Sequence, residues 1–148
     1  MDKEGVNYDD VLKEAQALGY AESDPAADVE GSDAADKIAI LSGLAFGGSI
    51  NRSNIPTTGI NHLEAVDVNY ARKLGYGIKL LAISEKSKTN SKSEGSHPLS
   101  IWVEPTLVPE DNPLAGVNGV NNAILVEGSP IGQVMFFGPG AGLSLIHI

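Results

Sequence analysis

The residues with the clearest chemical potential lie between positions 18 and 37. This stretch carries six carboxylates and ends in a lysine: Glu22, Asp24, Asp28, Glu30, Asp33, Asp36 and Lys37. Asp33 and Lys37 are four residues apart, and this spacing puts both side chains on one face of a helix. An exposed pair of this kind contributes only about 0.3–0.5 kcal/mol. In a cleft, the same lysine held by a carboxylate can give or take a proton, which makes Asp33 and Lys37 a candidate catalytic pair.

Two further carboxylates, Glu22 and Asp28, precede this pair in the same stretch. There they can fold over the ammonium group of a ligand through charge-assisted hydrogen bonds. Ordinary solvated loop charge is the alternative, and composition leaves it open. A calcium loop does not fit, because Gly31 at the sixth position would put Ala26 first and Lys37 twelfth, and neither side chain ligates calcium.

The pair must be positioned by a helix that we expect to begin near Ser32, with Ser32 or Gly31 as its cap. Its apolar residues continue to a stop at Gly47 and Gly48. Since the later turns are apolar nearly all round, we expect a central buried helix whose first turn opens into a cleft. A shorter amphipathic helix, over residues 7–18, is expected before the acidic stretch.

The rest of the chain changes from helical to strand patterns. A third helix is expected from a cap at Asp67 to Gly75. Strand patterns then occupy residues 78–83, 99–108, 122–126 and 133–137. Because helices come first and strands after, the order predicts an α+β fold, with helices packed on a mostly antiparallel or mixed sheet.

Composition narrows the class of protein. The chain has 148 residues, a formal net charge of −9 and no cysteine. This charge argues against nucleic acid and anionic membranes as partners, and the lack of thiols excludes disulfides and thiolate metal sites. No metal site is expected, because His62, His97 and His147 lack zinc-ligand spacing. The start lacks a signal-peptide pattern, and the longest apolar tract, residues 38–50, is too short to span a bilayer. We therefore expect a cytoplasmic domain.

A glycine-rich stretch follows the last strand pattern, with Gly138, Gly140 and Gly142 at alternate positions. Such a strand end lets backbone approach a phosphate or a ring closely. No helix pattern follows it, so on spacing alone a simple turn is the stronger interpretation.

Several of these stretches together resemble the homoserine dehydrogenase family. The resemblance covers roughly residues 8–142 in the family's order. It rests on Leu18-Gly19-Tyr20-Ala21-Glu22, Asp24-Pro25, Asp28-Val29-Glu30-Gly31, Asp33-Ala34-Ala35 with Lys37, Leu74-Gly75-Tyr76, Ile78-Lys79-Leu80-Leu81, Pro105-Thr106-Leu107-Val108-Pro109, Asn122-Ala123-Ile124 and Gly138-Pro139-Gly140-Ala141-Gly142. The first of these motifs is long enough to be specific.

The resemblance implies a catalytic-domain fold and an activity. The family interconverts L-homoserine and L-aspartate 4-semialdehyde with NAD or NADP, in threonine and methionine biosynthesis. It implies that Lys37 is the proton donor and acceptor and that Asp33 orients it. It further implies roles for two other groups of residues. They are Glu22, Tyr20 and Asp28 at the amino-acid end of the substrate, and Gly138, Gly140 and Gly142 near the cofactor.

The resemblance also sets expectations about domains and partners. Residues 1–142 are expected to be an incomplete catalytic domain, and residues 143–148 a non-family tail or truncation scar. The family's nucleotide-binding domain has no counterpart here, so the cofactor would be bound mainly outside this chain, and the isolated fragment would be inactive. A homodimer paired through the sheet is expected. The alternative is a non-catalytic module that binds amino acids or dimerises while keeping the fold.

Overall fold

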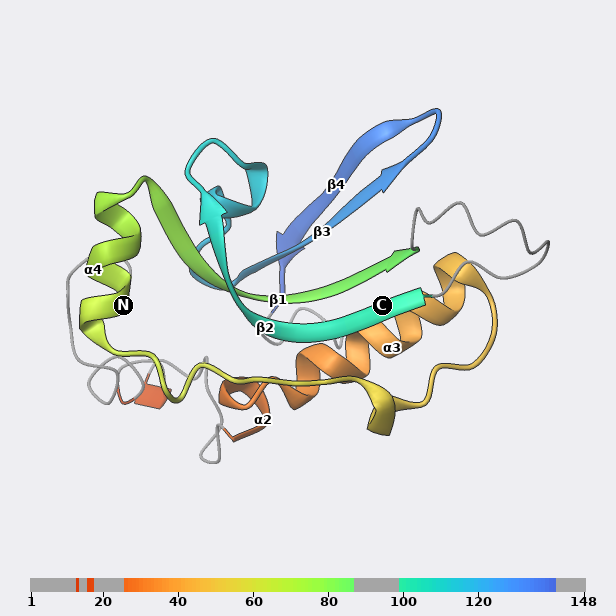
Figure 1. The fold of residues 1–148 in the computed structure, drawn as a ribbon, viewed down its shortest axis with the longest axis horizontal. Helices are drawn as coiled ribbons and strands as arrows, with labels where there is room; N and C mark the ends of the chain where they lie inside the picture. The colour runs from red at the N-terminus through yellow and green to blue at the C-terminus, as the bar shows by residue number, and fades with distance from the viewer. Residues whose placement is uncertain (1–12, 14–15, 18–25, 87–98, 141–148) are drawn as a thin grey trace. The chain divides into compact units, whose positions relative to one another are not determined.

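The helices and strands were located in a computed structural model, which describes residues 13, 16–17, 26–86 and 99–140. The elements are α2 (Ala26–Val29), α3 (Ser32–Phe46), η1 (Arg52–Asn54), α4 (Ala65–Lys73), β1 (Tyr76–Lys86), β2 (Leu99–Pro109), η2 (Pro113–Gly116), β3 (Asn121–Gly128) and β4 (Gly132–Pro139) (Figure 1). The predicted helix over residues 7–18 lies almost wholly outside the described residues. Helices followed by strands confirm the predicted α+β class.

The described chain divides into two compact units. The first, here called the α3 unit, comprises residues 26–63, 80–86 and 99–106. The second, here called the hairpin unit, comprises residues 64–79 and 107–140. Among the described residues the strands pair two by two, β1 with β2 and β3 with β4, where one larger sheet was expected.

The core of the α3 unit lies between α3 and the strands β1 and β2, along which α3 runs (Figure 1). Ala35 of α3 and Val103 of β2 are almost completely buried, and Ile55 joins them. Partly buried apolar side chains pack around these three: Ala34, Ile38, Ala39, Ile50, Leu80, Ala82 and Ile101. The α3 residues in this core are mostly alanines, whose small side chains let the helix lie close to the strands. The core therefore uses one face of the helix.

The bounds of α3 match the prediction, but its burial does not. The exposed fractions of Ile40 and Leu44 are 66% and 79% in the chain as described. The expectation of a helix buried all round is therefore wrong for this chain. The physical reason is that the core residues of this unit cover only one side of α3. None of these core residues packs against the apolar side chains on the other side of α3.

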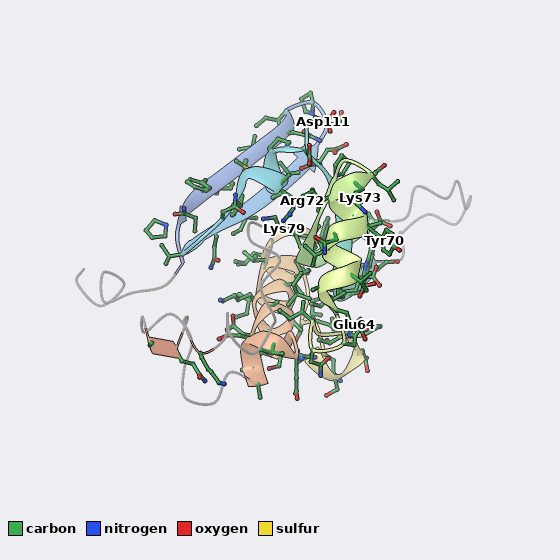
Figure 2. All side chains as sticks on the ribbon, turned by 90° about the vertical axis from the view of Figure 1, so that its left-hand side faces the viewer. Glu64, Tyr70, Arg72, Lys73, Lys79 and Asp111 are labelled. Atoms are coloured by element: carbon green, nitrogen blue, oxygen red, sulfur yellow. The ribbon has the colours of Figure 1, made fainter. Side chains whose placement is uncertain are left out.

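In the hairpin unit, the N-cap of α4 lies three residues before the predicted cap. Glu64 is the N-cap, and its backbone N–H donates to Asp67 Oδ2 at 2.9 Å. The predicted cap, Asp67, is instead the third helical residue, where a carboxylate satisfies an orphan N–H of the first turn. Figure 2 shows α4 with Tyr70, whose ring lies 5.7 Å from Lys73 Nζ. Val68 and Ala71 are the buried residues of this helix.

The β3–β4 hairpin forms as the sequence predicts, around a turn at residues 128–132. The strands are antiparallel, with Ile124 opposite Phe136 and Leu125 opposite Met135. Before the hairpin, Lys79 Nζ donates to Val117 O at 2.7 Å and to Asn118 Oδ1 at 3.1 Å, which ties β1 to the loop that leads into β3. Across residues 26–86 and 99–140, no helix is long and apolar enough to cross a membrane.

Candidate functional site

Asp33 and Lys37 meet on the first two turns of α3. Lys37 Nζ donates to Asp33 Oδ2 at 2.5 Å, the i, i+4 contact that the sequence predicts. The helix begins immediately before them, at Gly31, whose carbonyl accepts the first helical hydrogen bond from Ala35 N at 3.0 Å. This charge-assisted hydrogen bond places the lysine amine beside the carboxylate.

The surroundings of this pair are more open than expected. The side chain of Lys37 is 58% exposed and that of Asp33 is 45% exposed. The described residues therefore do not form the enclosed cleft that the sequence predicted over the first turn. Asp33, Lys37, Ile40 and Leu44 follow one another at spacings of four, three and four residues, so the pair shares a helix face with two exposed apolar side chains.

Two close backbone approaches fix where α3 begins. Gly31 has φ +81°, and a Cβ there would lie 3.2 Å from Val103 Cγ1 and 3.3 Å from Thr57 Cγ2. A Cβ on Gly59 would lie 2.3 Å from the carbonyl oxygen of Val29. Only glycine fits at these two positions without displacing backbone or core side chains. Since Gly31 is two residues before Asp33, these contacts set the position of the candidate pair.

A short extended segment, residues 55–60, completes this arrangement. Val103 N donates to Pro56 O at 2.9 Å, and Thr58 N donates to Val103 O at 2.8 Å. Thr57 and Val103 form a parallel bridge, so the segment runs beside β2 like a third strand. At its other end Ile60 N donates to Val29 O at 2.8 Å. The segment therefore joins β2 to the α2–α3 corner.

The other predicted substrate residues fall at or before this corner. Asp28 lies in α2, where it is exposed. Ser32 Oγ donates to Ala27 O at 3.2 Å, which links α2 to the first turn of α3. Glu22 and Tyr20 lie outside the described residues. No group of three or more His, Cys, Asp or Glu side chains suited to a metal ion occurs among the described residues.

Two of the three predicted cofactor glycines, Gly138 and Gly140, lie in the hairpin unit, and their surroundings differ. A Cβ on Gly138 would meet nothing within 4 Å. A Cβ on Gly140 would lie 1.9 Å from Asn122 Nδ2, and Gly140 N donates to Val120 O at 2.8 Å. Gly142 lies outside the described residues. The contact with Asn122 gives Gly140 a structural explanation that needs no nucleotide.

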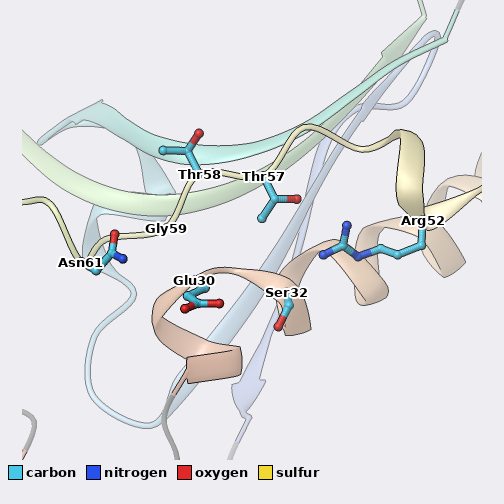
Figure 3. A pocket seen from close by; sticks show the side chains of 7 residues that line it. All are labelled: Glu30, Ser32, Arg52, Thr57, Thr58, Gly59 and Asn61. Atoms are coloured by element: carbon cyan, nitrogen blue, oxygen red, sulfur yellow. The ribbon is translucent and has the colours of Figure 1, made fainter.

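A hollow of about 470 Å³ opens beside the α2–α3 corner, and no sequence pattern indicated it. It is lined by Glu30, Ser32, Arg52, Thr57, Thr58, Gly59 and Asn61 (Figure 3). Arg52 was overlooked because it contacts α3 only in the folded chain, where its Nε donates to Asp36 Oδ1 at 2.9 Å across 16 residues. The one usable sequence signal was Asn51, which caps the 3₁₀ turn that carries Arg52.

Comparison with known proteins gives a consistent result over nearly the whole chain. The family model described as Homoserine dehydrogenase matches residues 1–145. A homoserine dehydrogenase of Synechocystis sp. is 54% identical over 142 residues, which are 96% of this chain and 32% of that protein. One from Corynebacterium glutamicum is 48% identical over 96% of this chain and 31% of that protein.

Solved structures give the same picture. A homoserine dehydrogenase from Thiobacillus denitrificans has a TM-score of 0.87 and 46% identity, over 96% of this chain and 31% of that one. A hyperthermophilic archaeal homoserine dehydrogenase in complex with NADPH has a TM-score of 0.63 and 30% identity, over 93% of this chain and 36% of that one. The chain spans about a third of the length of the relatives it matches.

Proposed function

Because this chain belongs to the homoserine dehydrogenase family, we propose that it supplies the proton-transfer and substrate-binding residues of such an enzyme. The reaction proposed is the interconversion of L-homoserine and L-aspartate 4-semialdehyde. The observation that carries the proposal is the 2.5 Å contact between Lys37 Nζ and Asp33 Oδ2 on the first turns of α3. It joins the two residues for which the resemblance implies a catalytic role.

Lys37 is assigned the proton at the substrate oxygen. Oxidation of the hydroxyl of homoserine to a carbonyl releases that proton, and the reverse reaction needs it back. In the oxidative direction the neutral amine of Lys37 accepts the proton. In the reductive direction the ammonium returns it. Asp33 accepts a hydrogen bond from the lysine and so keeps the nitrogen aimed at one place. Asp33 therefore positions Lys37.

The amino-acid end of the substrate is assigned to carboxylates near the start of α3. Asp28 is exposed on α2, one corner away from the pair, and is available to an ammonium group. Glu22 and Tyr20 complete the proposed set and lie outside the described residues. A carboxylate set suits this ligand, because homoserine carries a positive charge on its α-amino group at neutral pH.

A nicotinamide dinucleotide, NAD or NADP, supplies the hydride chemistry in the proposed reaction. The described residues do not by themselves form a cradle for it, because Asn122 closes the space at Gly140 and Gly138 offers only open backbone. We therefore assign the dinucleotide mainly to a part of the enzyme that this chain does not span. Gly138, Gly140 and Gly142 are left as candidate neighbours of the cofactor, and no step is derived through it.

We further propose that the enzyme is a homodimer that pairs through the strands of this region. The β3–β4 hairpin exposes large apolar side chains, among them Phe136 at 61% and Phe137 at 57%. Exposed aromatic residues are enriched where two proteins meet. Sedimentation at micromolar concentration should give twice the mass of one chain. The variant Phe136→Ser should lower the measured mass toward that of a single chain.

The test of the activity is a fusion of this chain to the nucleotide-binding part of a relative. The fusion should oxidise L-homoserine with NAD or NADP, followed by the absorbance of the reduced nicotinamide, and the isolated 148-residue chain should not. If the fusion is folded and binds the dinucleotide but oxidises no homoserine, the catalytic proposal fails. The non-catalytic, amino-acid-binding module would then account for the fold better.

A further inference from the structure

We propose that the hollow beside the α2–α3 corner binds a free α-amino acid as its zwitterion, at a place separate from the Asp33–Lys37 pair. Opposite charges line the hollow, with Glu30 on one side and Arg52 on the other (Figure 3). An α-amino acid carries the complementary charges on neighbouring atoms. The inference goes beyond the proposed reaction and does not depend on it.

Two hydroxyl groups, on Ser32 and Thr57, lie between Glu30 and Arg52 in the hollow (Figure 3). Ser32 Oγ donates its proton to Ala27 O, and Thr57 Oγ1 donates its proton to Ile55 O at 3.0 Å. Both hydroxyl oxygens are therefore left with lone pairs to offer. Together with the carboxylate of Glu30 they provide three acceptor groups, and an ammonium group has three N–H donors to place.

The opposite side offers donors from Arg52. Its Nε donates to Asp36 Oδ1, and the guanidinium extends into the hollow from the end away from Glu30, where its other N–H groups are hydrogen-bond donors (Figure 3). The N-terminus of α3 is close by, because Ser32 is its first residue and no side chain caps it. A guanidinium beside uncapped helical N–H groups favours a carboxylate. Glu30, Arg52 and Asp36 sum to one negative charge, which excludes a simple anion as the preferred ligand.

The walls of the hollow are held in place. Gly59 lies against the backbone of Val29 and Glu30, and Thr57 is bridged to Val103 in the core. A ligand there meets a preformed surface, so little of its binding energy is lost in ordering the protein. The hollow, about 470 Å³, is open to solvent, so a ligand there would keep part of its surface in water.

The hollow and the candidate catalytic pair occupy neighbouring faces of α3. Ser32 and Asp36 are four residues apart and face the hollow and Arg52. Asp33 follows Ser32, and Lys37 follows Asp36, so the second pair is turned by about 100° around the helix from the first. The two sites therefore share the first two turns of α3 without sharing a side chain.

The test titrates the full 148-residue chain with glycine and follows backbone amide chemical shifts. Glycine should produce saturable shifts at Ser32, Thr58 and Gly59 in the millimolar range. Methylamine and acetate, each with one of the two charges, should bind about tenfold more weakly. This comparison of probes uses the unaltered chain, so it stands even where a variant fails to fold. Equal binding of methylamine, or no saturable shift at these amides, would overturn the proposal.

Matched variants identify the side chains involved. Glu30→Gln and Arg52→Met should each lower the affinity for glycine about tenfold. Glu85→Gln and Lys86→Met make the same charge changes elsewhere in the α3 unit, and they should leave the affinity for glycine unchanged. Asp36→Asn removes the ion pair but keeps the guanidinium, so glycine should bind at least as tightly. If Arg52→Met and Asp36→Asn lower the affinity for glycine equally, the proposed contact between the Arg52 guanidinium and the carboxylate of glycine is wrong. Glycine shifts that depend on Lys37 and not on Glu30 would assign the binding to the other face of α3.

Discussion

Glycines occur both at the α2–α3 corner and at the end of β4, yet the two regions use them differently. At the corner, Gly31 and Gly59 are required by backbone and core contacts of 3.2 Å or less. At the end of β4, Gly138 faces open space, and the atoms nearest to a Cβ on Gly140 belong to the side chain of Asn122. Asp28 and the Asp33–Lys37 pair thus lie next to a corner whose glycines are required by close contacts. Gly138 and Gly140 meet no backbone contact of this kind among the nearest atoms.

The largest effect expected on this comparison is that of Gly59→Ala on stability. The new Cβ would overlap a backbone carbonyl at 2.3 Å, so the α2–α3 corner must shift, at a cost of about 3 kcal/mol. The free energy of unfolding in denaturant measures it. Gly116→Ala is the matched control, since a Cβ on Gly116 would meet nothing within 4 Å and its φ is not positive, and it should stay within about 0.5 kcal/mol. Equal costs for the two variants would mean that the corner is not held as described.

Asp33→Asn is expected to have the next largest effect, on turnover in the fusion with a nucleotide-binding part. The neutral amide holds Lys37 less firmly, so kcat should fall about tenfold while the chain stays folded. Steady-state kinetics with saturating homoserine give this value. Asp111→Asn makes the same change at an exposed carboxylate of the hairpin unit and should leave kcat unaltered. A variant at position 33 that is indistinguishable from this control would remove Asp33 from the site.

Gly140→Ala should have a smaller and reversible effect. Its Cβ would displace the side chain of Asn122, which costs about 1 kcal/mol in the free energy of unfolding. Adding Asn122→Ala should recover most of that loss, and a double-mutant cycle measures the coupling. Gly138→Ala, which meets nothing, should stay within about 0.5 kcal/mol. An uncoupled cycle would show that something other than Asn122 requires glycine at position 140.

The smallest effect on stability is expected from Lys37→Ala. Both partners of the pair are about half exposed, and an exposed i, i+4 pair contributes about 0.5 kcal/mol or less. Unfolding in denaturant at low and high salt should therefore give nearly the same curve for this variant and the unaltered chain. A loss of several kcal/mol would make Lys37 a structural residue and weaken its catalytic assignment.

Local patterns predicted much of this fold. The bounds of α3 followed from Gly31, Ser32 and the glycines at its end, and the hairpin followed from two strand patterns around Gly128. The contact between Asp33 and Lys37 followed from their spacing alone. Each of these features depends on residues close together in the sequence, where helix and turn geometry decide the outcome.

What local patterns could not supply depends on contacts between distant segments. The exposure of Ile40 and Leu44 depends on which sides of α3 are covered, and periodicity does not report that. The hollow depends on Arg52 meeting Asp36 and on Gly59 meeting Val29, across 16 and 30 residues. The cap of α4 was misplaced because Glu64 and Asp67 both suit the start of a helix, and only the structure separates N-cap from third residue.

The most direct test of the central assignment is the turnover of Lys37→Ala in the fusion that oxidises homoserine. Loss of the group that moves the proton should lower kcat by about 10²–10⁴-fold with little change in KM. Lys73→Ala, which removes an exposed lysine of α4, should keep full turnover. If Lys37→Ala also keeps full turnover, proton transfer lies elsewhere and the role given to the first turns of α3 is wrong.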